Sequence, residues 1–141
     1  MGTRNSAFVV IYRHDHVLLV KAREKRRWSL PGGTIKIGET PWEAALREAE
    51  EETALEPELI GISGMYVRDD GSLAYVFAAR VSGDVDPVGP RHEIVKQRWM
   101  GVRKALTRLS DAGRRRLQDA LGLRSRTVAS ISAERFALRA I

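Results

Sequence analysis

Three glutamates in one short stretch are the residues of this sequence best placed to do chemistry. Glu48, Glu51 and Glu52 stand at spacings i, i+3 and i+4. A helix turns by about 100° per residue, so a helix here would bring them to one arc. Carboxylates that close repel one another, and the neighbouring Arg47 supplies only one positive charge. The missing counter-charge is a divalent metal, and oxygen-only ligands favour Mg²⁺ or Mn²⁺. The alternative is a glutamate-rich helix face that is simply hydrated.

The residues before these glutamates carry the signature of a helix start. In Thr40-Pro41-Trp42-Glu43, the threonine can cap, the proline suits the first helical position and the glutamate completes a capping box. The pattern predicts a helix that runs to about Ala54 and stops before Pro57. Its core-facing stripe should consist of Trp42, Ala45, Leu46, Ala49 and Thr53.

Apolar runs on both sides of this helix predict strands. Ala7–Tyr12 and Val17–Val20 read as one hairpin, and Leu59–Val67 and Leu73–Val81 read as a second around a turn rich in Asp and Gly. Further elements are a short strand over 34–37 after the break at 31–33, a strand over 94–100, and a helix over 110–121 that Gly122 stops. This order predicts an α/β fold with a mixed β-sheet and helices packed against it.

Length and composition exclude several classes of protein. The chain has 141 residues, of which 43% are hydrophobic and 30% charged, which fits one compact domain. The absence of cysteine rules out a disulfide framework, a cysteine zinc site and a thiol nucleophile, and it fits the cytoplasm, where we expect the protein to act. No apolar stretch approaches the ~20 residues of a spanning helix, so we expect no membrane partner.

Charge is unevenly distributed along the chain. Residues 39–58 carry eight acidic and one basic side chain. In contrast, residues 1–38 carry eight basic and two acidic side chains, and residues 101–141 carry ten basic and three acidic. An anionic island in a cationic chain suggests two partners, a cation and a polyanion that bridges to it. The alternative is that the basic residues only solubilise the surface.

The stretch Gly33–Leu55 resembles the Nudix box, a 23-residue signature. The residues at the required spacings are Gly33, Glu39, Arg47, Glu48, Glu51, Glu52 and Leu55, and 28–32 (WSLPG) look like the usual lead-in. Ala54 departs from the pattern, because the family has glycine there. Alanine adopts the left-handed conformation less readily than glycine, so the usual helix end of the family is not assured here. The change removes no expected metal ligand.

The resemblance implies a Nudix-type α/β/α sandwich over residues 1–122, followed by a basic, amphipathic tail over 123–141. It implies hydrolysis of a nucleoside diphosphate linked to another group, with Mg²⁺ or Mn²⁺ as cofactor. Carried over residue by residue, Glu48 and Glu52 are metal ligands and Glu51 binds a further metal or its water. The main-chain carbonyl of Gly32 or Gly33 is an additional ligand. Arg47 would orient the carboxylates, and Glu39 would be a structural residue outside the ligand set.

The proton acceptor and the substrate contacts lie outside the signature. Glu93 occupies the place where many members of the family have a later catalytic glutamate, while His92 and a glutamate of the box are its rivals. Arg23 is the candidate for binding the phosphates. Trp28 could stack on a base, with core packing as the alternative.

The substrate class follows by elimination. Markers of ADP-ribose, dinucleoside polyphosphate, NADH and diphosphoinositol hydrolases are missing, which leaves a MutT-like hydrolase of a nucleoside triphosphate, ordinary or modified. Alternatives that stay open are RNA 5′-pyrophosphate removal, hydrolysis of ADP-ribose or of another nucleotide-sugar or diphosphoinositol-type compound, and a non-catalytic Nudix-fold binding module. No aromatic platform accompanies the basic residues 101–141, which counts against a nucleic-acid partner. The tail would pack on its own domain or on a second subunit, giving a homodimer.

Overall fold

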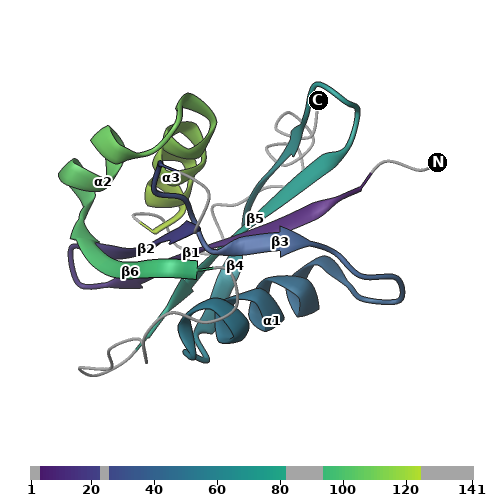
Figure 1. Ribbon diagram of the computed structural model, residues 1–141, viewed down its shortest axis with the longest axis horizontal. Coiled ribbons are helices and arrows are strands. Elements are labelled where there is room, and N and C mark those ends of the chain that lie inside the picture. The colour runs from purple at the N-terminus through teal and green to yellow at the C-terminus, as the bar shows by residue number, and fades with distance from the viewer. Residues whose placement is uncertain (1–3, 23–25, 82–93, 125–141) are drawn as a thin grey trace.

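A six-stranded mixed sheet runs through the middle of the molecule, with helices on both of its faces (Figure 1). The computed structural model describes residues 4–22, 26–81 and 94–124. The strands are β1 (Ser6–Arg13), β2 (His16–Ala22), β3 (Gly32–Thr34), β4 (Glu58–Val67), β5 (Leu73–Arg80) and β6 (Ile94–Gly101), and the helices are α1 (Pro41–Thr53), α2 (Val102–Arg108) and α3 (Asp111–Arg124). The α/β fold with a mixed sheet is therefore confirmed.

Strand β1 is the centre of this sheet. The strand order is β4-β5-β1-β2-β6, and β3 pairs with the first half of β1. Strands β1 and β5 are parallel, from Ser6 opposite Ala74 to Tyr12 opposite Arg80. The hairpins β1–β2 and β4–β5 and the pair β2–β6 are antiparallel, as the two apolar hairpins of the sequence predict. The chain thus makes one long crossover between β1 and β5, and this crossover contains β2, β3, α1 and β4.

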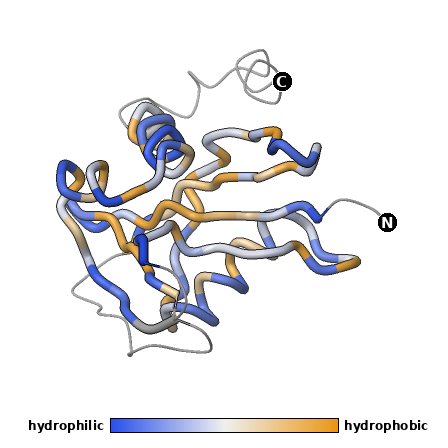
Figure 2. Tube along the Cα trace, turned by 45° about the horizontal axis from the view of Figure 1, so that its top comes forward, coloured by the Kyte–Doolittle hydropathy of each residue, from blue (hydrophilic) through white to orange (hydrophobic). Residues whose placement is uncertain are grey.

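Alternating side chains of the central strands build two core layers. Val9 and Ile11 of β1 pack with Ala45 and Ala49 under α1. Val10 and Tyr12 face the other way, into a layer closed by residues of α2 and α3 that include Leu117. Full burial of one such aliphatic side chain contributes about 1.5–3 kcal/mol. Figure 2 shows hydrophobic colour along the central strands, whereas hydrophilic and hydrophobic segments alternate along the helices. No helix in the described part of the chain is both long and apolar enough to cross a membrane.

Helix α1 begins and ends as its sequence predicts. The Thr40 Oγ1 accepts a hydrogen bond from the Glu43 backbone N–H, and the Glu43 carboxylate accepts one from the Thr40 N–H, which completes the capping box. At the other end, Ala54 adopts the left-handed conformation with φ 63° and ψ 13°. Its N–H donates to the Glu50 carbonyl at 2.8 Å. The alanine in the glycine position therefore does not abolish the left-handed helix end.

Three local predictions were wrong, and one helix was not predicted. The strand after the break covers Gly32–Thr34 rather than 34–37, because the glycines themselves pair with Ala7 and Phe8, and Ile37 is fully exposed. Trp42 has the right angle for the core stripe, but its side chain is 52% exposed in the first turn of α1. The short helix α2 was not predicted. Helix α3 continues through Gly122, because a glycine inside a helix only weakens it.

Candidate active site

The close approach of β3 to α1 brings the backbone of the Pro-Gly-Gly segment to the acidic helix face. A Cβ added to Gly33 would lie 2.4 Å from Glu48 Oε1 and 2.6 Å from its Cδ, so any larger residue would displace this carboxylate. One residue earlier, the Gly32 N–H donates a hydrogen bond to Glu52 Oε2 at 3.1 Å. Strand β3 therefore holds two of the three carboxylates in place. The resemblance implies a carbonyl ligand from Gly32 or Gly33, and both glycines lie in direct contact with the glutamates.

Glu52 is the most deeply placed of the three carboxylates. Burial, reinforced by the negative charge of Glu48, raises the pKa of the Glu52 carboxyl to about 8. The Gly32 N–H acts in the opposite direction and compensates only in part. On β6, Gln97 donates a hydrogen bond from its side chain to the Glu52 main-chain oxygen, which ties the end of α1 to the far strand of the sheet. The hydrogen bond from Gly32 therefore does not fully compensate for the burial of Glu52 and its repulsion by Glu48.

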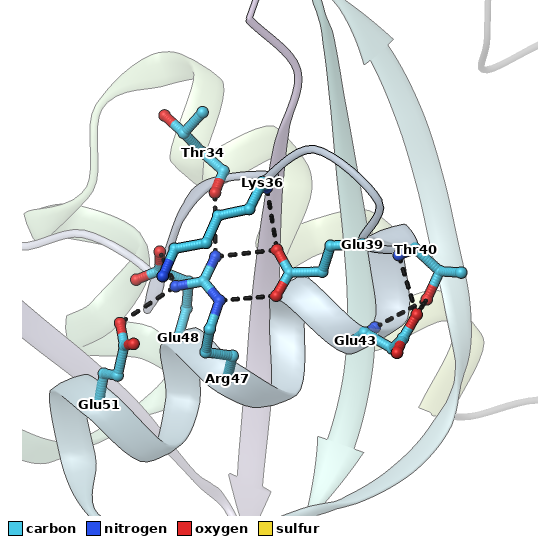
Figure 3. A network of polar contacts seen from close by, with 8 residues as sticks. All are labelled: Thr34, Lys36, Glu39, Thr40, Glu43, Arg47, Glu48 and Glu51. Atoms are coloured by element: carbon cyan, nitrogen blue, oxygen red, sulfur yellow. Dashed lines mark hydrogen bonds and ion pairs between the residues drawn. The ribbon is translucent and has the colours of Figure 1, made fainter.

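Arg47 forms the centre of a polar network on the same side of the helix (Figure 3). Its Nε and Nη2 donate to the two oxygens of Glu39 at 2.7 and 3.0 Å, a bidentate pair. Its Nη1 donates to Glu48 Oε1 at 3.0 Å and to Glu51 Oε2 at 3.1 Å. Nη2 also donates to the Thr34 carbonyl at 3.1 Å. One guanidinium therefore fixes Glu48 and Glu51 on α1 relative to β3 and the following turn.

The pKa values of Glu39 and Glu48, which both bind Arg47, are shifted in opposite directions. The hydrogen bonds from Arg47 and from the Lys36 backbone N–H lower the pKa of the Glu39 carboxyl to about 2. Burial instead raises the pKa of the Glu48 carboxyl, and the hydrogen bond from Arg47 offsets this only in part. Glu39 is therefore a firmly ionised anchor for Arg47. Glu48 and Glu52 are the carboxylates whose charge is not fully compensated.

A pocket of about 790 Å³ opens beside the network. Its walls mix acidic and basic side chains, together with apolar residues, and are formed by Arg4, Asn5, Thr34, Ile35, Lys36, Ile37, Arg47, Glu48 and Glu51. Figure 3 shows the Lys36 side chain extending over the Arg47 guanidinium toward Glu48. A ligand in this pocket would meet the carboxylates of Glu48 and Glu51 together with the cations Arg4 and Lys36.

The donor set has the chemistry of a site for a hard divalent cation. Three carboxylates on one helix arc offer the oxygen ligands that Mg²⁺ and Mn²⁺ favour. In the part of the chain that the structure describes, no three acidic or histidine side chains form a preorganised metal-binding site. Arg47 holds one oxygen each of Glu48 and Glu51. Binding of a cation would require these carboxylates to share or leave that guanidinium.

Other predicted site residues do not join this cluster. Trp28 is partly buried against the core layer under α2 and α3, with Arg98 5.6 Å from its ring centre. Arg23, Glu93 and His92 lie outside the described residues, as does the tail beyond residue 124. Three residues of the site were missed by sequence reasoning, namely Gln97, Lys36 and Arg4. For Gln97 a signal existed in the sequence, since this polar residue stands two positions from Val95 and from Trp99 in the strand pattern.

Comparison with known proteins agrees with this geometry. The NUDIX domain model matches residues 2–121. A Streptomyces ambofaciens "MutT-like protein" is 30% identical over 116 residues, which are 82% of this chain and 74% of that protein. A "Nucleoside triphosphate pyrophosphatase/Nudix hydrolase fusion protein" of Bifidobacterium longum is 34% identical over 125 residues, 75% of this chain but only 26% of the relative.

Among solved structures, a NUDIX hydrolase from Nitrosomonas europaea is similar with a TM-score of 0.77 at 21% identity, covering 89% of this chain and 73% of that one. This likeness shows the same fold. The sequence matches identify the family. The signature of this family includes the three glutamates that lie together on α1. The chain belongs to the Nudix family and is a MutT-like hydrolase that acts on pyrophosphate bonds.

Proposed function

We propose that this Nudix hydrolase is a divalent-metal-dependent nucleoside triphosphate pyrophosphohydrolase, acting on ordinary or modified NTPs or dNTPs. Water adds across a P–O–P bond of the substrate, and a nucleoside monophosphate and pyrophosphate leave. The observation that carries this proposal is the placement of Glu48 and Glu51 on one wall of a pocket that also presents Arg4 and Lys36. A triphosphate is long enough to engage carboxylate-bound cations and protein cations together.

Glu48, Glu51 and Glu52 would hold Mg²⁺ or Mn²⁺, with a main-chain carbonyl of Gly32 or Gly33 as a further ligand. When bound, the cation supplies positive charge against the phosphate oxygens of the reacting group. Arg47 keeps Glu48 and Glu51 in register through its hydrogen bonds at 3.0 and 3.1 Å. Glu39, with both oxygens on Arg47, acts on the reaction only through that guanidinium.

The remaining roles belong to residues around this centre. Lys36 and Arg4 would neutralise the part of the polyphosphate that projects into the pocket. Arg23 is a further candidate for the phosphates and Trp28 for the base. The proton of the attacking water goes to Glu93, His92 or a glutamate of the box. Single substitutions of each candidate, with the pH profile of kcat/KM, identify the acceptor as the residue whose loss removes the limb of the profile that rises with pH. The cysteine-free composition favours action in the cytoplasm.

A substrate panel tests the proposal directly. The panel should hold ordinary and oxidised NTPs and dNTPs, ADP-ribose, a nucleotide sugar, a dinucleoside polyphosphate, a diphosphoinositol compound and 5′-triphosphate RNA, each with Mg²⁺ and with Mn²⁺. We expect the highest kcat/KM with a nucleoside triphosphate, and pyrophosphate as product. Hydrolysis in ¹⁸O-labelled water then shows which phosphorus is attacked. A higher kcat/KM for any other class would overturn the substrate assignment while leaving the family unaffected.

A further inference from the structure

A half-buried arginine on α3 has no acidic partner in the described part of the chain. Burial lowers the pKa of the Arg116 guanidinium, and the nearby positive charge of Arg68 lowers it further. Its Nε is buried and makes no hydrogen bond to any residue that the structure describes. Removing a cation from water without pairing it is costly, so such a group needs an explanation.

Aromatic rings surround this guanidinium instead of carboxylates. Arg116 lies 5.2 Å from the ring centre of Phe8 and 5.3 Å from that of Tyr66. Arg68, just after β4, lies 5.7 Å from the same Phe8 ring. Cation–π contacts attract each guanidinium to the rings, but they do not remove the repulsion between two like charges. We call these four residues, Phe8, Tyr66, Arg68 and Arg116, the arginine–aromatic cluster.

The nearest carboxylate on the same helix is already engaged elsewhere. The Tyr66 hydroxyl donates to Asp119 Oδ2 at 2.6 Å. This hydrogen bond fixes the Tyr66 ring, against which Arg116 rests. The Tyr66 ring is thus held by the fold. Among the described side chains Arg116 has no carboxylate partner, and Asp70, which interacts electrostatically with Arg68, supplies one negative charge, which leaves an excess of positive charge on the two guanidinium groups. This is the arrangement of a preformed anion site.

The cluster and the acidic site meet at one glycine, the cluster from the sheet face covered by α2 and α3 and the carboxylates from helix α1. Phe8 pairs with Gly32 across β1 and β3, and a Cβ added to Gly32 would stand 2.4 Å from Phe8 Cδ1. The N–H of the same glycine donates to Glu52. Gly32 therefore touches the phenyl ring of the cluster and one carboxylate of the active site. A ligand that spans this glycine can engage both.

We propose that Arg68 and Arg116 form a second anion-binding site, specific for a phosphate-type group, next to the hydrolytic centre. The guanidinium of Arg116, which lies beside the two rings, would donate its N–H groups to the anion. The phosphate belongs either to the substrate, at a position remote from the bond that is cleaved, or to free inorganic phosphate. The first assignment rests on the proposed function, whereas the anion site itself does not.

Binding of inorganic phosphate to the metal-free protein tests the site without any turnover. The thermal unfolding midpoint is measured in chelator with increasing phosphate, against sodium chloride of equal ionic strength. A ligand that binds only the folded state raises this midpoint. We compare the wild type with Arg116→Met and Arg68→Met, which keep an apolar contact to the rings. Arg115→Met is the matched control, because Arg115 is the exposed neighbour of Arg116 on the same helix.

We expect phosphate to stabilise the wild type and Arg115→Met equally, and the other two variants at least tenfold less at a given concentration. Without phosphate, Arg116→Met should be as stable as the wild type or more stable, since it removes an unpaired cation. An equal response to phosphate in all four proteins would overturn the site. A loss of stability in Arg116→Met without phosphate would also overturn it, since it would show a purely structural arginine.

Kinetics then separate the two sources of the anion. If the phosphate is part of the substrate, inorganic phosphate competes with a nucleoside triphosphate, and Arg116→Met raises KM while kcat changes little. If free phosphate is the ligand, phosphate alters kcat without competing, and Arg116→Met abolishes that response. Both results support the site. A KM and a phosphate response that are identical in wild type and Arg116→Met would exclude any role of the site in turnover.

Discussion

The carboxylate of Glu48 lies directly against the α-carbon of Gly33, where any larger residue would place a Cβ 2.4 Å from Glu48 Oε1. This contact joins a strand to a helix that begins eight residues later in the chain. It explains in physical terms why glycine must stand at the first position of the acidic signature. The same contact also determines where one of the expected metal ligands points.

Replacing Gly33 by alanine should therefore impair the reaction more than the fold. The new methyl group displaces the Glu48 carboxylate, which sits at the end of a flexible side chain. Misplacement of a reacting group by about 1 Å can cost on the order of 100-fold, so we expect kcat/KM to fall about 10- to 100-fold. Gly61→Ala is the control, because no atom lies within 4 Å of its added Cβ. Equal kcat/KM values for the two variants would refute this account.

Glu52→Gln should abolish metal-dependent hydrolysis. The amide keeps the shape of the side chain and removes the charge that we expect to bind the cation, so the fold should be unchanged. Measurement of pyrophosphate release with Mg²⁺ and of circular dichroism checks both halves of this prediction. Glu50→Gln, an exposed position on the same helix, is the matched control and should retain activity. Unchanged turnover in Glu52→Gln would end the ligand assignment.

The stability of the metal-free protein should depend on pH through the same carboxyl. Its pKa is about 8 in the folded state against 4.5 as the ordinary value. Between these values the folded chain holds a proton that the unfolded chain has lost, so this group makes stability decrease as pH rises from about 4.5 to 8. Denaturant unfolding in chelator should show this slope in the wild type and a flatter profile in Glu52→Gln. If the stability of the two proteins had the same pH dependence, the raised pKa of Glu52 would be contradicted.

Glu39→Gln should show the opposite dependence and a milder loss of activity. The pKa of Glu39 is lowered to about 2, so its ionised form stabilises the fold above the ordinary value of 4.5. That contribution is lost as pH falls from about 4.5 toward 2. The variant should therefore be less stable than the wild type at pH 7, and the difference should shrink in acid. Its kcat should fall less than that of Glu52→Gln, because Glu39 contacts Arg47 and not the pocket side of the carboxylates.

Ala54→Gly should stabilise the protein by about 1 kcal/mol, since glycine adopts the left-handed conformation without the penalty that alanine meets at φ 63°. The reverse change at Gly71, which has φ 85° in the turn between β4 and β5, should destabilise it by a similar amount. Free energies of unfolding from urea titrations measure both. A destabilised Ala54→Gly would show that the methyl group of Ala54 contributes packing that outweighs the backbone penalty.

Local chemistry made much of the fold and of the site predictable from the sequence. The capping residues Thr40 and Glu43 act within one turn of chain, and each hairpin pairs neighbours, so short-range patterns were sufficient. The arc of glutamates follows from helical geometry alone.

Features that depend on distant packing could not be predicted in this way. Trp42 has a core-facing angle on the helix, but it stands in the first turn and is largely exposed. The hydrogen bond from Arg47 to the Thr34 carbonyl depends on how β3 crosses α1. The pairing of Tyr66 with Asp119 joins residues 53 positions apart, and no local pattern predicts it.

The parallel pairing of β1 with β5 sets the order in which this enzyme can assemble. Ser6 lies opposite Ala74, so the pairing closes a loop of 68 residues that contains the whole acidic helix. Closing so long a loop has a high entropic cost and makes folding slow relative to local hairpins. Until β5 has been synthesised, the sheet is incomplete and cannot hold β3 against α1. The site should therefore become able to bind a cation late in synthesis. That ability should arise when β1 pairs with β5, and not already when the helix with the three glutamates forms.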